Sequence, residues 1–159
     1  MKLQFGNNVP ASIEEVYEYV TGVGPDGPLD RELFSQKYGE IEQEGDEGIV
    51  TRVADGDAEV IWRSTFDYPY QRLMVVDSSS ADREDTFVVV KGGTKWTVTV
   101  HSKKGGFSGL VQWLYFQAIG KYRVGVPVLS PVVFYFRRKA RAAEREAAEV
   151  SPESPEAED

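Results

Sequence analysis

Few side chains in this sequence have the types and spacing that chemistry requires. The chain has no cysteine and one histidine, His101, so disulfides and thiolate metal ligands are excluded. No His, Asp and Glu spacing typical of a metal site accompanies His101. Strand alternation places His101 on the same polar face as Lys95, Thr97 and Thr99, so we interpret it as a surface residue. We therefore expect no metal and no cofactor.

Charged and hydroxyl side chains on the predicted strands allow two interpretations. A buried charge among Arg63, Asp67 and Arg72 could orient the polar end of a ligand, but we favour pairing between strands at the surface. Ser64 falls on the apolar face and could hydrogen-bond to a ligand. Nothing pairs a nucleophile with a positioned base, so no catalytic residue is assigned and the sequence favours a non-enzymatic role.

A larger set of aromatic residues indicates binding rather than catalysis. These side chains could form an ordinary core, or they could line an apolar cavity and pack against rings or acyl chains. We predict a ligand cavity lined by Trp62, Ser64, Phe66, Phe87, Trp96, Val98, Trp113 and Phe116.

The elements that must position these residues begin with one strand and two short helices. Residues 1–11 alternate weakly and predict a strand that ends at Pro10. Ser12 and Glu15 have the spacing of a capping box, which predicts a helix that ends before Gly22. A second helix is predicted over residues 28–38, with Leu29, Leu33 and Phe34 at helical spacing.

From Glu40 the hydrophobic period changes to two, which predicts a series of strands joined by short turns. The predicted strands begin at Ile41 and continue over residues 49–54, 58–68, 71–77, 86–91 and 94–102, with residues 78–85 as a turn. Such segregated runs are typical of an α+β fold with an antiparallel sheet. One face of this sheet, which carries Trp62, Phe66 and Trp96, is apolar and needs a cover.

The covering element is predicted to be residues 107–136, a mostly apolar stretch in which only Lys121 and Arg123 are charged. We expect one helix from Ser108 to about Ile119, and a joint that contains Pro127. A second helix would begin with Ser130 at the N-cap and Pro131 at the first helical position, and would continue into the charged segment RRKARAAEREAAE.

The same stretch allows a different interpretation, because the basic residues Arg137, Arg138, Lys139 and Arg141 follow it directly. An apolar segment beside a basic cluster is typical of peripheral membrane contact, here through residues 107–141. The central charges argue against a transmembrane span.

A net charge of −8 argues against nucleic acid as a partner. The N-terminal sequence has no features of a secretory signal, so we expect a cytoplasmic protein, with membrane contact left open.

Three strings resemble the START-related superfamily, often called SRPBCC: VPASIEEVYEYV, YPYQRLM and GGTKWTVTV. The resemblance covers about residues 1–148, which we take as a single domain followed by a disordered acidic tail at 149–159. It implies a helix-grip fold, in which a curved antiparallel sheet of about six to seven strands wraps a C-terminal helix. Two short helices would follow the first strand. The two prolines at 127 and 131 depart from the single long C-terminal helix of that family.

The resemblance also implies a function. Members of the superfamily hold apolar or amphipathic small molecules, including lipids, sterols and aromatic polyketides, between the sheet and the C-terminal helix. We therefore predict binding, transport or sequestration of such a molecule. One alternative is a polyketide-cyclase-like or other enzyme on the same fold. Another is a peripheral membrane or protein-interaction module that docks through residues 107–136.

Overall fold

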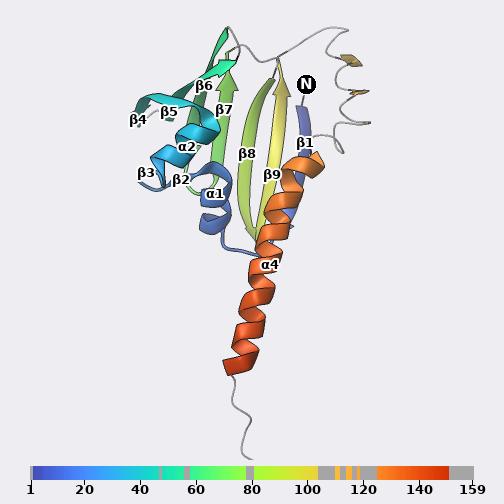
Figure 1. The fold of residues 1–159 in the computed structure, drawn as a ribbon. Coiled ribbons are helices and arrows are strands. Elements are labelled where there is room, and N and C mark those ends of the chain that lie inside the picture. Colours follow the sequence, from blue (N-terminus) through green and yellow to red (C-terminus); the bar gives the residue numbers. More distant parts are fainter. Residues whose placement is uncertain are drawn as a thin grey trace, which may run out of the picture.

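The computed structural model describes residues 2–46, 48–55, 58–77, 81–103, 110–111, 114–115, 118 and 125–150. Within them, a seven-stranded sheet is covered on one side by helices (Figure 1). In chain order the elements are β1 (Lys2–Val9), α1 (Ile13–Thr21), β2 (Val23–Gly24), β3 (Gly27–Pro28), α2 (Arg31–Tyr38), β4 (Glu40–Gly45), β5 (Gly48–Asp55), β6 (Ala58–Asp67), β7 (Gln71–Val76), β8 (Ala81–Val90), β9 (Gly93–Ser102) and α4 (Val126–Val150).

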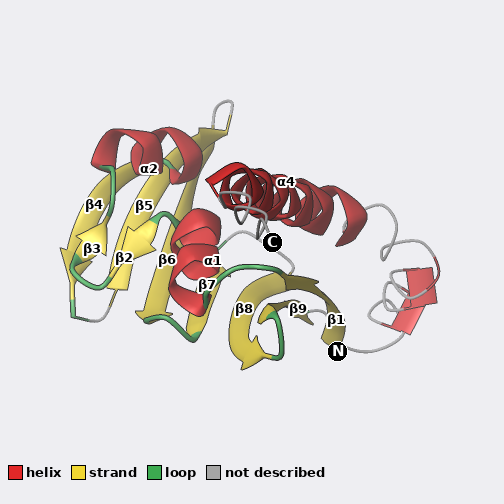
Figure 2. Cartoon of the chain, turned by 90° about the horizontal axis from the view of Figure 1, so that it is seen from below, coloured by secondary structure: helices red, strands yellow, loops and turns green. Residues whose placement is uncertain are grey.

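The sheet is antiparallel throughout, with the strand order β1-β9-β8-β7-β6-β5-β4. Consecutive strands from β4 to β9 are neighbours, and β1 adds to the outer edge of β9. The sheet bends, and α1, α2 and α4 all lie on its concave side (Figure 2). The predicted α+β helix-grip architecture, with two short helices after the first strand, is therefore confirmed.

The register places alternate residues of each strand on the concave face. Trp96 lies opposite Phe87, and Val98 lies opposite Asp85. The buried apolar residues form two clusters. The larger one joins β1, β8 and β9 to α1 and α4, and the smaller one joins β5 and β7 to α2. Phe66 packs against both clusters from β6, so it connects them on the concave face.

Helix α1 begins and ends as its sequence predicts. The Ser12 hydroxyl accepts a hydrogen bond from the Glu15 amide, and the Glu15 side chain accepts one from the Ser12 amide. Gly22 ends the helix with a φ of 74°, a left-handed conformation that glycine adopts without strain. The buried side of α1 includes Val16 and Tyr17, which fixes the helix against the sheet.

Helix α2 starts later than predicted and buries a different face. Asp30 is its N-cap, because the Asp30 carboxylate accepts a hydrogen bond from the Leu33 amide at 3.0 Å. Leu29 and Leu33 are exposed, and Phe34 and Tyr38 are the buried members of the helix. The predicted apolar face was therefore wrong for the two leucines.

Strand β8 begins five residues before its predicted start, so residues 81–85 are not part of a turn. They pair with β9 from Ser102 to Val98. The sequence ADRED has no apolar alternation, but its charged residues find partners across the sheet. Lys103 pairs with Asp82, and His101 pairs with Glu84. These polar contacts across the sheet replace the apolar pattern that normally marks a strand.

Helix α4 corrects the predicted start of the second C-terminal helix. It begins at Val126 rather than at Ser130, and Pro131 lies inside it. Pro127 occupies the first turn, where an amide has no helical partner, so its missing N–H costs little. Pro131 lies only one turn further on, where it removes a single early hydrogen bond.

The first half of α4 covers the sheet, and its second half extends past the sheet edge (Figure 1). Leu129, Val132, Val133 and Phe136 pack into the larger core cluster. The helix predicted from Ser108 to about Ile119 lies mostly outside the described residues, as do residues 151–159 of the predicted tail. Within the described part of the chain, no helix is both long and apolar enough to cross a membrane.

Candidate functional site: a cavity under the C-terminal helix

A cavity of about 630 Å³ lies between the concave face of the sheet and the three helices. Residues of α1, α2, four neighbouring strands and α4 line it. The apolar part of the wall comes from Trp62, Met74, Val76, Trp96, Val100, Val128 and Val132. Members of both core clusters border the cavity, Trp96 and Val132 from the larger one and Tyr38 and Met74 from the smaller one.

One side of the cavity is polar and contains a buried ion pair. Arg72 on β7 and Asp85 on β8 are 2% and 0% exposed, respectively. Arg72 donates to Asp85 Oδ2 from Nη2 at 2.6 Å and from Nε at 3.1 Å. The two residues are direct partners across the strands, so the register of the sheet sets their contact.

Further donors surround the same carboxylate. Arg83 donates to Asp85 Oδ1 from Nη2 at 2.8 Å, and the Trp96 indole N–H donates to the same oxygen at 3.0 Å. Arg72 reaches a second partner, because its Nη1 donates to the Tyr38 hydroxyl at 2.8 Å. The Tyr38 hydroxyl in turn donates to the Val20 carbonyl at 3.1 Å. The network therefore links α1, α2, β7, β8 and β9.

The charges in this network shift the pKa values of its members. Burial alone would raise the pKa of Asp85, but the guanidinium groups of Arg72 and Arg83 outweigh burial and lower it. Burial would likewise raise the pKa of Tyr38, and the positive charges of Arg72 and Lys37 lower it instead. Asp85 is thus held as a carboxylate, and Arg72 is held as a cation.

The predicted cavity residues occupy three kinds of position. Trp62 and Trp96 line the cavity. Phe87 and Val98 are buried in the larger core cluster, and Ser64 and Phe66 are partly buried on the same face of β6. Trp113 and Phe116 lie outside the described residues. Contact of any of these side chains with a ligand stays a prediction.

The position of Arg72 contradicts the expectation that the charged strand residues pair at the surface. Arg63 does pair at the surface, with Asp77, but Arg72 points into the protein. The segment QRLMVV carries apolar residues at both phases after Arg72, so its alternation did not show which face is buried. Asp85 was missed because it fell in the predicted turn.

His101 lies on the polar face, as predicted, and its Nε2 is 2.7 Å from Glu84 Oε2. The described residues contain no group of three or more His, Asp or Glu side chains that could hold a metal ion. The network of Arg72, Arg83 and Asp85 described above therefore provides the hydrogen-bond donors and the positive charge that the polar side of the cavity offers to a bound molecule.

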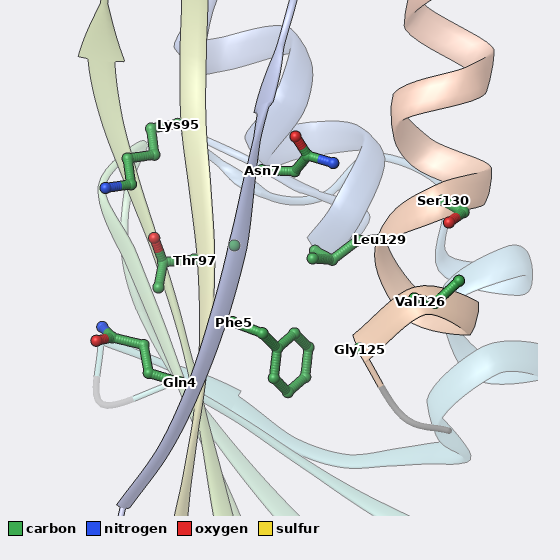
Figure 3. A pocket seen from close by; sticks show the side chains of 10 residues that line it. Gln4, Phe5, Asn7, Lys95, Thr97, Gly125, Val126, Leu129 and Ser130 are labelled. Atoms are coloured by element: carbon green, nitrogen blue, oxygen red, sulfur yellow. The ribbon is translucent and has the colours of Figure 1, made fainter. Parts of the chain in front are cut away.

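A second hollow of about 600 Å³ runs along the free edge of β1 (Figure 3). Phe5 and Asn7 of β1 lie on one side of it, and Val126 and Ser130 of α4 lie on the other. Lys95 and Thr97 of β9 also border it. Gly125, which directly precedes α4, also lines it.

No model of a known protein family matches the chain, and no curated protein matches it in sequence. Solved structures do share its fold. The protein SSP2350 from Staphylococcus saprophyticus is 18% identical, with a TM-score of 0.53, over 86% of this chain and 92% of that one. Ara h 8.0201 is 15% identical, with a TM-score of 0.51, over 87% and 98% of the two chains. Aha1 from Colwellia psychrerythraea is 14% identical, with a TM-score of 0.44, over 74% and 91%.

These structural neighbours are helix-grip proteins of the SRPBCC type. The fold implied by the sequence resemblance is therefore confirmed. At such low identity the likeness concerns the fold alone.

Proposed function

We propose that this protein binds an apolar or amphipathic small molecule in the cavity between its sheet and α4. The observation that carries the proposal is the cavity of about 630 Å³ under α4, with Trp62, Trp96 and Val100 in its wall. Its volume falls within the range of roughly 300–1,000 Å³ that small-molecule sites occupy. Helix-grip proteins commonly bind hydrophobic ligands, which supports the same function.

Burial of apolar surface would provide most of the affinity. Each Å² of apolar ligand surface removed from water contributes roughly 25 cal/mol. Trp62 on β6 is a partly exposed aromatic residue of the wall, Trp96 on β9 is almost fully buried in it, and Val128 and Val132 border the cavity from α4. The helix therefore serves as the lid of the site as well as part of the core.

Native mass spectrometry of protein purified from its source is the direct test. We expect a co-purifying small molecule that leaves the protein on unfolding. A protein whose mass shows no adduct, and which also binds no apolar fluorescent probe, would contradict the proposal.

A substitution that fills the cavity should weaken ligand binding. Val100→Trp places a larger side chain in the cavity and should weaken probe binding at least about tenfold. Val88→Trp is the matched control, because Val88 is exposed on the neighbouring strand β8. The control should bind the probe as the unaltered protein does.

One observation favours a second candidate, docking of α4 to an anionic membrane surface. Phe134 is exposed on α4, and the exposed residues Arg137, Arg138 and Arg141 follow within two turns. Exposed aromatic and basic residues on one face of a helix are typical of segments that lie on anionic membrane surfaces, where the basic residues contact the headgroups. Sedimentation with vesicles that contain phosphatidylserine, and not with neutral vesicles, would support this candidate, and Phe134→Ser together with Arg138→Gln should abolish it.

The enzyme alternative would need a group in the cavity that can exchange a proton near neutral pH. Asp85 is a poor candidate, because two guanidinium groups hold its pKa low. Its oxygens also accept hydrogen bonds from Arg72, Arg83 and Trp96. The arrangement of these groups suits the recognition of a charged ligand better than proton transfer.

A further inference from the structure

The polar side of the cavity holds more positive than negative charge. Arg72 and Arg83 share one carboxylate, that of Asp85, so one positive charge of this group is not compensated. Lys37, which also lines the cavity, adds a second positive charge, and its described hydrogen bond goes to the Val20 carbonyl rather than to a carboxylate. Asp82 is the acidic residue among the described lining residues, and its Oδ1 lies 2.7 Å from Lys103 Nζ. This surplus occurs inside a protein whose net charge is −8.

The positive groups form one continuous cluster. Lys37 Nζ lies 5.0 Å from the centre of the Tyr38 ring, and the guanidinium carbon of Arg72 lies 5.5 Å from it. Arg72 then joins Arg83 through Asp85. The surplus charge is therefore concentrated on the side of the cavity formed by α2, β7 and β8.

Two of these cations have donors available to a ligand. The Arg83 side chain is 32% exposed, and its hydrogen bonds to described residues, from Nε and Nη2, all go to Asp85. Those bonds leave Nη1 for another acceptor. Lys37 is exposed, and its ammonium group donates to the Val20 carbonyl at 3.2 Å, which uses one of its three protons.

Given the proposed binding function, on which this step rests, we infer that the ligand is an amphipathic anion. Its carboxylate, or a group of similar charge, accepts hydrogen bonds from Arg83 and Lys37. Its apolar part lies against Trp62, Val100 and Val132. An anion at this position neutralises the surplus charge, whereas a neutral ligand leaves the positive charge of Arg72 and Arg83 partly uncompensated beside a buried ion pair.

Dodecanoic acid and dodecanol provide a matched pair of probes, because they share an alkyl chain and differ in the charge of the headgroup at neutral pH. Titration of each, with dodecanoate below its critical micelle concentration and dodecanol below its solubility limit, is followed by tryptophan fluorescence and gives two dissociation constants. We expect dodecanoate to bind at least about tenfold more tightly than dodecanol. Equal affinities would overturn the inference and leave the binding function standing. If neither probe binds and no adduct co-purifies, the binding function fails as well.

Variants of Arg83 and Lys37 identify which cation is responsible for the preference for dodecanoate over dodecanol. Arg83→Gln and Lys37→Gln should each reduce the preference for dodecanoate to within about threefold, with the affinity for dodecanol unchanged. Arg63→Gln is the matched control, since Arg63 is an exposed strand arginine that pairs with Asp77 outside the cavity. Unchanged dodecanol binding shows that a variant is folded. A preference that survives in both cavity variants would overturn the assignment, and Lys37→Gln alone decides if Arg83→Gln does not fold.

Discussion

Arg72 and Asp85 face each other across β7 and β8 on the concave side of the sheet, with Arg72 Nη2 2.6 Å from Asp85 Oδ2. Both side chains are buried, so neither charge can return to water in the folded state. A buried pair of this kind depends on each of its partners, since the loss of one leaves the other uncompensated. The same pair forms the base of the polar side of the cavity, so it affects stability and recognition together.

Asp85→Asn should therefore be strongly destabilising. The change keeps the shape of the side chain and removes the negative charge that Arg72 and Arg83 share. We expect the free energy of unfolding to fall by about 3–5 kcal/mol, measured by urea denaturation followed by circular dichroism. Arg72→Met should cost less, because Arg83 and Trp96 still donate to the carboxylate.

The surface pair Arg63–Asp77 supplies the control, since both side chains are largely exposed. Arg63→Met should change the free energy of unfolding by no more than about 0.5 kcal/mol. An Asp85→Asn variant as stable as this control would show that the buried network contributes little.

The free energy of unfolding should depend on pH in acid because of the lowered pKa of Asp85. Its pKa is lowered in the folded protein, because Arg72 and Arg83 outweigh the opposing effect of burial. The unfolded chain has an Asp pKa of about 3.9, so the contribution is fully present above about pH 5 and decreases as the pH falls below about 4. Urea midpoints measured from pH 3 to pH 7 should fall in acid, and this acid-dependent loss should be smaller in Asp85→Asn. Parallel curves for the two proteins would contradict the assignment.

The sequence predicts much of this fold because several elements carry complete local signals. The capping box at Ser12 and the alternation around Trp96 each identify an element and its buried face without tertiary information. The convergence of Trp62 and Trp96 on one side follows from the same alternation. The fold resemblance then indicates what covers that side.

The polar half of the site could not be predicted in the same way. Asp85 sits in a run of charged residues that is typical of a turn, and only pairing with β7 and β9 makes it part of a strand. Arg72 is buried because Asp85 lies opposite it, and a contact between residues 13 apart has no local signature. A search for opposite charges at matching positions of predicted neighbouring strands could have suggested the pair.

Ser12 and Ser130, each predicted to be a helix cap, should respond differently to substitution. Ser12→Ala removes a hydrogen bond to the Glu15 amide and should cost about 1 kcal/mol of unfolding free energy. Ser130→Ala should be neutral or slightly stabilising, because Ser130 lies within α4 and alanine is the better helix former. Thermal or urea denaturation of the two variants measures the difference. A cost at Ser130 as large as that at Ser12 would show instead that α4 begins at Pro131.

The two phenylalanines of α4 should show how that helix is held on the sheet. Phe136 is 3% exposed and packs in the larger core cluster, whereas Phe134 is 70% exposed. Phe136→Ala should lower the free energy of unfolding by about 3–5 kcal/mol, because it removes buried apolar surface and leaves a cavity. Phe134→Ala, the same change two residues away, should alter it by no more than about 0.5 kcal/mol. Similar losses at both positions would mean that a surface beyond the described residues covers Phe134, and small losses at both would mean that α4 is not docked on the sheet as described.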